Sequence, residues 1–250
     1  MRLTRRQSRY FNFLPDTITA FNLFTGFLSI LMASQGKMQL AGWLIAIALV
    51  WDSLDGNLAR AFKNPTLLGR ELDSLADIVS FVVAPAFLVY SFLLNPWNLW
   101  IVLLLFLYLG AGAYRLARFN VQPPVKDYFV GLPTPAAAMV LSMTLLACVK
   151  NHWTDPVLFS LITVSLLVIL SCLMVSEIRY PKLSALRFSK WQSFFYAGAA
   201  VFAVVFFPFN VQTALCSLSL LYLFLSPLYC LPSYHFGTQG EIHLSPKDAD

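Results

Sequence analysis

Long apolar stretches separated by short polar segments make up most of the 250-residue chain. Each stretch approaches the roughly 20 residues that a helix needs to cross the hydrocarbon layer of a bilayer. The pattern predicts eight membrane-spanning helices, at about 15–34, 39–62, 72–94, 97–119, 132–150, 155–175, 191–208 and 211–230. The sequence FFPFN separates the last two, so a tight turn or a re-entrant pair stays open there. The expected fold is therefore an all-α integral membrane bundle.

The two ends of the chain differ from this pattern. The segment MRLTRRQSRYFNF interleaves arginines with aromatic residues, which predicts a short amphipathic helix lying along an anionic lipid surface. A polar tail closes the chain. We therefore divide it into an interfacial segment (1–14), a transmembrane domain (15–230) and a polar C-terminal tail (231–250).

Composition agrees with a membrane protein. The chain is 58% hydrophobic and only 12% charged, whereas soluble domains carry about 25% charged residues. No cleavable signal is expected, because the first apolar run follows a basic lead and continues as a span. The four cysteines are scattered over apolar segments without the spacing of a zinc site or a disulfide framework. The net charge of +5 is placed at the helix ends, which favours lipid and not nucleic acid.

Basic residues also predict the orientation. With an even number of spans, both termini share one side with the loops at 60–71, 115–131 and 176–190. That side holds all of the 17 lysines and arginines except Lys37 and Lys150. The positive-inside rule places it in the cytoplasm. We therefore expect a polar cavity open to the cytoplasm in the cytoplasmic membrane.

The most distinctive polar stretch is DSLDGNLARAFKNPTLLGRELDSLAD, at residues 52–77. Asp52 and Asp55 lie at the end of one predicted span, and Asp73 and Asp77 at the start of the next. Spacings of three and four place each pair on one helix face. Four converging carboxylates need cations between them, and hard oxygen ligands suit Mg²⁺, Mn²⁺ or Ca²⁺. The alternative is a set of helix-end acids solvated at the interface, although ionisable groups at membrane depth are usually functional.

Small residues accompany the acids. Gly56, Ala59 and Gly69 leave room for a flat ligand close to the helix backbone. Arg60 can pair with an acid or hold a phosphate with its bidentate fork.

The pattern D-x2-D-G-x2-A-R-x8-G-x3-D-x3-D resembles the signature of the CDP-alcohol phosphatidyltransferases. The resemblance implies that the stretch binds two divalent metal ions and the cytidine diphosphate of a CDP-linked lipid, and that the enzyme is a homodimer. The implied metal ligands are Asp52, Asp55, Asp73 and Asp77. The implied CDP-diacylglycerol contacts are Asp55, Gly56, Ala59, Arg60, Gly69 and Asp73. Asp77 would also be the catalytic base.

A second group of polar residues ends the fourth span, in GAGAYRLARFNVQPP. Arg115 and Arg118 share a helix face beside Asn120, so they are candidates for binding a carboxylate or phosphate. The alternative is that both arginines only anchor the helix at the interface. The next span begins GLPTPAAA, where Thr134 could cap a helix whose N-terminus favours an anion; a well-started helix would explain it equally.

These stretches, together with LMVSEIRYP at 173–181, resemble the phosphatidylserine synthases of the same superfamily. The resemblance implies transfer of a phosphatidyl group from CDP-diacylglycerol to L-serine with release of CMP. Arg115, Arg118 and Asn120 would then bind serine, with Thr134 and Arg179 as possible phosphate or lipid contacts. SALRFSK follows where a shorter Phe-Lys continuation is expected, so Arg179 is a better candidate than Lys182.

Two other functions stay open. Another acceptor, glycerol 3-phosphate or inositol phosphate, would be a dianion and would require more cations around the cavity. A cation-coupled transporter could use the aspartates as an ion site, but such sites usually lie near the midplane on broken helices of paired repeats. Asn22 and Thr17 lie inside the first span. A buried asparagine there usually bonds a neighbouring helix, and we expect this in place of the alternative, direct contact with substrate.

Overall fold

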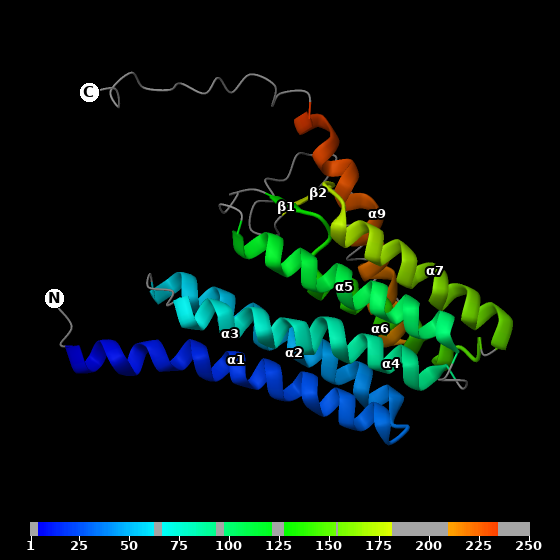
Figure 1. The fold of residues 1–250 in the computed structure, drawn as a ribbon, viewed down its shortest axis with the longest axis horizontal. Helices are drawn as coiled ribbons and strands as arrows, with labels where there is room; N and C mark the ends of the chain where they lie inside the picture. The colour runs from blue at the N-terminus through cyan, green and yellow to red at the C-terminus, as the bar shows by residue number, and fades with distance from the viewer. Residues whose placement is uncertain are drawn as a thin grey trace.

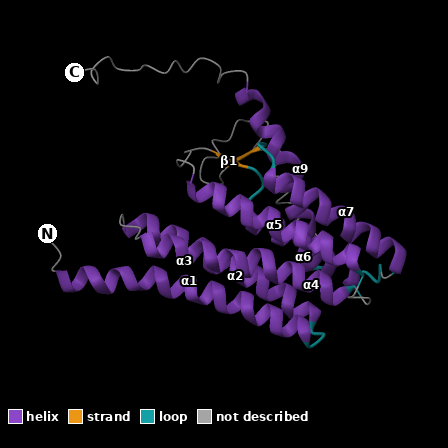
Figure 2. Cartoon of the chain, in the orientation of Figure 1, coloured by secondary structure: helices purple, strands orange, loops and turns teal. Residues whose placement is uncertain are grey.

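The computed structural model describes the backbone of residues 5–62, 67–93, 98–121, 128–153, 155–181 and 210–234. Almost all of it is helical, as Figure 2 shows. The helices are α1 (Arg5–Ser34), α2 (Met38–Phe62), α3 (Leu67–Asp77), η1 (Ile78–Val83), α4 (Ala84–Phe92), α5 (Leu99–Val121), α6 (Thr134–Lys150), α7 (Pro156–Val175) and α9 (Val211–Tyr234). Two short strands, β1 (Tyr128–Val130) and β2 (Arg179–Pro181), pair antiparallel.

Five described segments are long and apolar enough to cross a membrane: Thr17–Ser34, Met38–Gly56, Leu68–Phe92, Leu99–Val121 and Pro156–Val175. They match five of the predicted spans. Two further predicted spans correspond to the shorter apolar helices Thr134–Lys150 and Val211–Phe224. The predicted span at 191–208 lies outside the described residues. The chain is thus a helical protein with several membrane-spanning segments.

The N-terminal part differs from the sequence prediction. The backbone of α1 is one helix from Arg5 to Ser34, so the expected amphipathic segment continues directly into the first span. Pro15 lies within this helix but does not end it. A separate N-terminal helix was therefore the wrong prediction.

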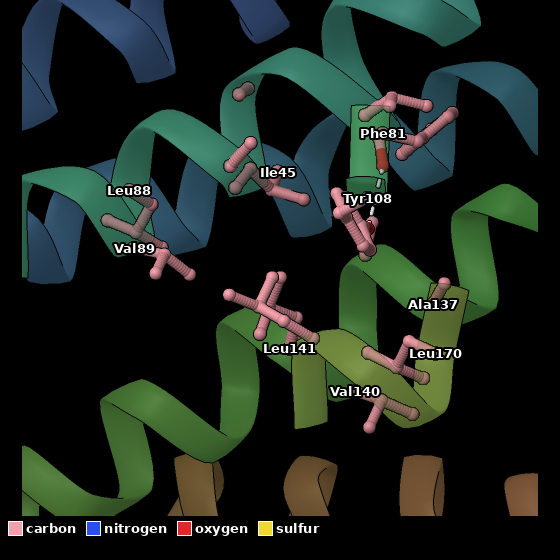
Figure 3. Close-up of a cluster of buried hydrophobic side chains, with 14 of the residues drawn as sticks. Ile45, Phe81, Leu88, Val89, Tyr108, Ala137, Val140, Leu141 and Leu170 are labelled. Atoms are coloured by element: carbon pink, nitrogen blue, oxygen red, sulfur yellow. Dashed lines mark hydrogen bonds between the residues drawn. The ribbon is translucent and has the colours of Figure 1, made fainter. Parts of the chain in front are cut away.

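The helices form two groups that pack face to face. Figure 1 shows α1 to α4 on one side and α5, α6, α7 and α9 on the other. Buried aliphatic side chains fill the space between them, including Ile45 of α2, Leu88 of α4, Leu141 of α6 and Leu170 of α7, as Figure 3 shows. The only charged side chains among the buried residues of the described chain are those of the candidate site.

The third span contains a π-helical segment immediately after Asp77. In η1 the helix follows a wider register, and the Ala84 N–H bonds to the Val79 carbonyl, five residues earlier. Pro85 follows and has no N–H to donate to the Phe81 carbonyl. The buried Tyr108 hydroxyl donates to that carbonyl at 3.3 Å instead (Figure 3). The wide turn changes the rotational position of the helix after Asp77, as π-bulges often do at functional sites.

Close helix contacts fix α1 against this turn. A Cβ on Gly26 would lie 2.7 Å from the Ser80 Cα. The backbones of α1 and η1 are therefore so close here that only glycine fits without a shift. The Ser80 hydroxyl donates to the Asn22 carbonyl at 2.9 Å. The packing of α1 on η1 therefore places the middle of the first span beside Asp77.

The β1–β2 strand pair, whose strands are separated in sequence by α6 and α7, lies at the end of the bundle where α5 ends (Figure 1). Phe129 pairs with Tyr180 across the two strands. Tyr180 is fully buried, and burial raises the pKa of its phenol to about 12, so it stays neutral at physiological pH. Its ring lies 6.1 Å from that of Tyr222 on α9. The strand pair thus joins α9 to the end of α5 that carries the arginines.

Candidate active site

Three aspartates converge between the second half of α2 and the C-terminal end of α3. Asp52, Asp73 and Asp77 each offer a carboxylate oxygen, and these oxygens lie within 4.8 Å of one another. Asp52 comes from α2, whereas Asp73 and Asp77 are one helical turn apart on α3. Asp77 is only 9% exposed. Like charges at this separation repel strongly in a water-poor site, so the arrangement requires positive charge to balance it.

The fourth aspartate lies beside the cluster. Asp55 is 6% exposed, and the Thr19 hydroxyl of α1 donates to its carboxylate. Its charge still acts on Asp52 and Asp73. Asp55 therefore belongs to the same electrostatic site, although its oxygen atoms are not among the three that meet.

The first span contributes a side chain that sequence reasoning had given only a packing role. Asn22 on α1 is completely buried, and its amide nitrogen donates to Asp77 Oδ1 at 3.3 Å. The prediction that Asn22 bonds a neighbouring helix is confirmed, and its partner is the proposed catalytic carboxylate. A buried asparagine in an apolar span was the available signal. Thr17, considered with it, is exposed on α1.

The small residues near the acids differ in their surroundings. A Cβ on Gly56 would have no atom within 4 Å, so there is open space beside the backbone between Asp55 and the end of α2. Gly69 is half-buried on α3. Ala59 and Arg60 lie on α2, but their side chains are outside the described part of the structure. Gly56 is exposed, so the backbone of α2 is accessible at this residue.

Arg115 faces the acidic cluster from α5. Its side chain is 5% exposed, and its charge interacts with those of Asp77 and Asp52. One guanidinium nitrogen donates to the Thr134 hydroxyl at 3.2 Å. The guanidinium also stacks over Phe119 and Phe129, at 5.4 and 5.9 Å from the ring centroids. A buried cation held by neutral neighbours next to carboxylates can bind an anionic group of a ligand.

Arg118 points elsewhere. Its guanidinium donates to four main-chain carbonyls, those of Val130, Met174, Val175 and Ser176, at 2.9–3.3 Å. These bonds close the C-terminal end of α7 and tie it to β1. Gly131, with a φ of +78°, makes the approach possible, because a Cβ there would lie 2.5 Å from the Met174 carbonyl and 2.6 Å from the Arg118 guanidinium. Most of the Arg118 donors are thus bonded to the protein itself, and we no longer assign serine binding to it.

Three further predicted residues also make contacts within the protein. Asn120 donates to the Ser74 hydroxyl at 2.8 Å, linking α5 to α3. Thr134 does not cap α6: Pro133 holds the N-cap position, and the Thr134 hydroxyl accepts from Arg115. The Arg179 guanidinium of β2 lies 4.7 Å from the Tyr128 ring centroid on the paired strand β1. Thr134 therefore orients Arg115, while Asn120 and Arg179 lie at the borders of the site.

The residues present fit divalent cations. Carboxylates from two helices meet within a few ångströms, and their donor atoms are the hard oxygens that Mg²⁺, Mn²⁺ and Ca²⁺ prefer. The Asn22 side-chain oxygen is buried beside them without a hydrogen-bond partner among the described residues. An uncompensated acceptor next to clustered carboxylates is the environment in which a cation is expected.

Comparison with known proteins agrees with this site. Residues 12–170 match the family model of the CDP-alcohol phosphatidyltransferases. This match covers more than half of the chain, so the chain belongs to that family and is an enzyme. The matched region contains the aspartates, Asn22 and Arg115.

Curated relatives narrow the class. The chain is 34% identical over 212 residues to a CDP-diacylglycerol–serine O-phosphatidyltransferase of Helicobacter pylori, covering 83% of this chain and 88% of the relative. It is 34% identical over 175 residues to the archaetidylserine synthase of Methanothermobacter thermautotrophicus, covering 69% and 71%. It is also 36% identical over 169 residues to a CDP-diacylglycerol–serine O-phosphatidyltransferase of Methanocaldococcus jannaschii, covering 68% and 74%.

Proposed function

We propose that this protein is a CDP-diacylglycerol–serine O-phosphatidyltransferase, which makes phosphatidylserine and CMP from CDP-diacylglycerol and L-serine in phospholipid biosynthesis. The observation that carries the proposal is the buried Arg115 guanidinium beside the cluster of Asp52, Asp73 and Asp77. The acidic side suits a cation-bound diphosphate, and the arginine suits an acceptor with one carboxylate.

The proposed reaction follows from the acidic cluster and the buried arginine. The serine hydroxyl oxygen forms a bond to the phosphorus that carries diacylglycerol, and the bond from this phosphorus to the CMP oxygen breaks. Bound divalent cations, Mg²⁺ or Mn²⁺ with Ca²⁺ possible and two per site, would neutralise the charge of the diphosphate and of the departing CMP. Asp77 accepts the hydroxyl proton, and the Asn22 amide holds the Asp77 carboxylate in position.

Each remaining residue then has a distinct role. Asp52, Asp55 and Asp73 hold the cations with Asp77. Gly56 leaves space for the nucleotide against the backbone of α2, and we keep Asp55, Ala59, Arg60, Gly69 and Asp73 as its further contacts. Arg115 binds the serine carboxylate, and the rings of Phe119 and Phe129 hold its guanidinium by cation–π contacts.

Serine is favoured over other acceptors by a shared feature of the relatives. All three relatives have serine in their names. Two are named for CDP-diacylglycerol and the third for archaetidylserine. A phosphorylated acceptor such as glycerol 3-phosphate or inositol phosphate would add a dianion. Arg115 is the one buried cation within the described part of the chain, so it matches a single carboxylate better.

We further propose that the site opens to the cytoplasm through a polar cavity in a bundle of about eight spans, in the cytoplasmic membrane and with both termini on that side. Figure 1 shows the start of α3, the end of α5 and the strands β1 and β2 at one end of the bundle, and the α1–α2 turn and the end of α6 at the other. The first group of segments carries Arg70, Arg115, Arg118 and Arg179, and the second carries Lys37 and Lys150. This asymmetry supports the orientation through the positive-inside rule. The same proposal includes the division into segments 1–14, 15–230 and 231–250. It also includes a homodimeric assembly.

One experiment tests the function. Purified protein is incubated with CDP-diacylglycerol and Mn²⁺, and separately with serine, glycerol 3-phosphate or inositol phosphate, and CMP release is measured. We expect release with serine, loss after chelation of the metal, and recovery when Mn²⁺ is added back. Faster release with either phosphorylated acceptor would overturn the assignment of serine. Ion transport without CMP release would favour the transporter.

A further inference from the structure

The starting point is the position of Asn22, halfway along α1 and completely buried. Its main-chain carbonyl accepts from the hydroxyls of Ser80 and Thr25, both at 2.9 Å. Its side-chain nitrogen donates to Asp77 Oδ1 at 3.3 Å. Gly26, one turn later, brings the backbones of α1 and η1 into close contact. Several independent contacts thus hold the amide group beside the acidic cluster.

The side-chain oxygen of this amide has no hydrogen-bond partner in the described structure, and the residue is out of reach of solvent. Rotating the amide by 180° would not give the oxygen a donor. It would place the oxygen beside the Asp77 carboxylate, and both groups can only accept hydrogen bonds. In either orientation a buried oxygen needs a positive charge or a donor that the neighbouring side chains do not supply. A buried acceptor of this kind needs an explanation. Among the five buried polar side-chain atoms without a partner in the described residues, the Asn22 oxygen is the one on a side chain bonded to an aspartate of the acidic cluster, and there a bound cation accounts for it.

A divalent cation fits this oxygen well. Asparagine carbonyls are common ligands of Ca²⁺ and complete the oxygen shells of hard cations together with carboxylates. A neutral oxygen also raises the coordination number without adding to the negative charge of the aspartates. The Asn22 amide nitrogen already bonds to Asp77, and Asp77 is one of the proposed ligands of the cations.

We propose that the Asn22 side-chain oxygen is a ligand of the divalent cation held by Asp77, so that the metal site includes α1 as well as α2 and α3. The inference rests on the proposed function only in requiring cations at the aspartates. The first span would then take part in metal binding. The spacing of the aspartates does not indicate this, because they lie only on α2 and α3.

Mn²⁺ binding tests the proposal without reference to turnover. The full-length protein in detergent is titrated with Mn²⁺, and free Mn²⁺ is measured by electron paramagnetic resonance. Asn22→Leu removes the oxygen at similar volume and should weaken at least one site about 10- to 100-fold, as loss of a metal contact typically does. Asn22→Asp retains an oxygen at the same place and should bind Mn²⁺ within about threefold of wild type, or more tightly.

The matched control is Ser29→Ala on the same helix. Ser29 is buried and donates to the Ala41 carbonyl at 2.8 Å, so its loss loosens α1 against α2 without touching the cluster. Its Mn²⁺ affinity should equal that of wild type. Asn22→Ala takes the place of the leucine variant if that variant does not fold.

Two results would overturn the inference. Wild-type Mn²⁺ affinity in Asn22→Leu or Asn22→Ala would show that the oxygen binds no cation. Equal weakening in Asn22→Asp and Asn22→Leu would show that only the N–H bond to Asp77 matters. Failure of the proposed function is separate: wild-type protein that binds Mn²⁺ in an Asn22-dependent way but releases no CMP with serine would leave the inference standing.

Discussion

Arg115→Lys is the most informative change, because the structure separates two arginines that the sequence had grouped. Arg115 is buried beside the acidic cluster, whereas Arg118 is bonded to main-chain carbonyls. Lysine keeps the positive charge at residue 115 but loses the bidentate fork and the flat surface that stacks on Phe119 and Phe129.

The size of the effect follows from the bonds that are lost. A hydrogen bond to a charged group contributes about 1.5–3 kcal/mol. Losing one such bond to the serine carboxylate would lower kcat/KM for serine roughly 10- to 150-fold, since about 1.4 kcal/mol corresponds to a factor of ten. The KM for CDP-diacylglycerol should change much less, because the donor is proposed to lie on the Asp52–Asp77 side of the site.

The assay measures CMP release while serine and CDP-diacylglycerol are varied separately. Arg118→Lys is the matched control, three residues away on the same helix. It should leave the KM for serine near the wild-type value and instead lower thermal stability, because bonds to the carbonyls that end α7 are lost.

The opposite pattern would refute this reasoning. If Arg115→Lys raises the KM for CDP-diacylglycerol and leaves that for serine unchanged, Arg115 binds the donor phosphate. If Arg118→Lys gives the larger serine defect in a protein of normal stability, the acceptor site lies at Arg118, one of the residues that the sequence had grouped.

Other changes test the acidic cluster and the packing around it. Asp77→Asn should abolish CMP release while the protein stays folded, and near-normal release would exclude Asp77 as the base. Asp52→Asn should act through metal affinity, so high Mn²⁺ should restore part of its activity; no restoration in any of the four Asp→Asn variants would remove the support for a two-metal site. Gly26→Ala should destabilise the protein by about 1–3 kcal/mol and lower activity, because the added Cβ meets the Ser80 backbone; a thermal denaturation curve identical to wild type would contradict the close contact of α1 and η1.

Much of the fold could be predicted from local pattern. Apolar runs of sufficient length predicted the spans, because a bilayer leaves a chain little choice but helix. Spacings of three and four placed the aspartates on common helix faces, and the structure brings Asp52, Asp73 and Asp77 together across two helices. The same spacing carried the family resemblance, which the comparisons confirm.

The arginines show where local pattern is insufficient. Residues three apart point in directions that differ by roughly 60° around a helix. Long side chains that start in these two directions can therefore contact different helices. Arg115 bonds to Thr134 and its charge acts on the cluster, while Arg118 bonds to carbonyls at the end of α7. Which contact each makes depends on where α6 and α7 pass, and no periodicity in α5 contains that information.

The sequence by itself therefore determined the membrane-spanning helices, the shared faces of the acids and the chemistry those acids favour, since all three depend on short-range spacing. The tertiary structure alone decided which side chains complete the site. Asn22 becomes a partner of Asp77 because Gly26 lets α1 approach η1, and the wide turn before Pro85 shifts the hydrogen-bond register of the helix after Asp77. Helix crossings are set by packing between segments far apart in the chain, so the neighbours they create appear only when the bundle is assembled.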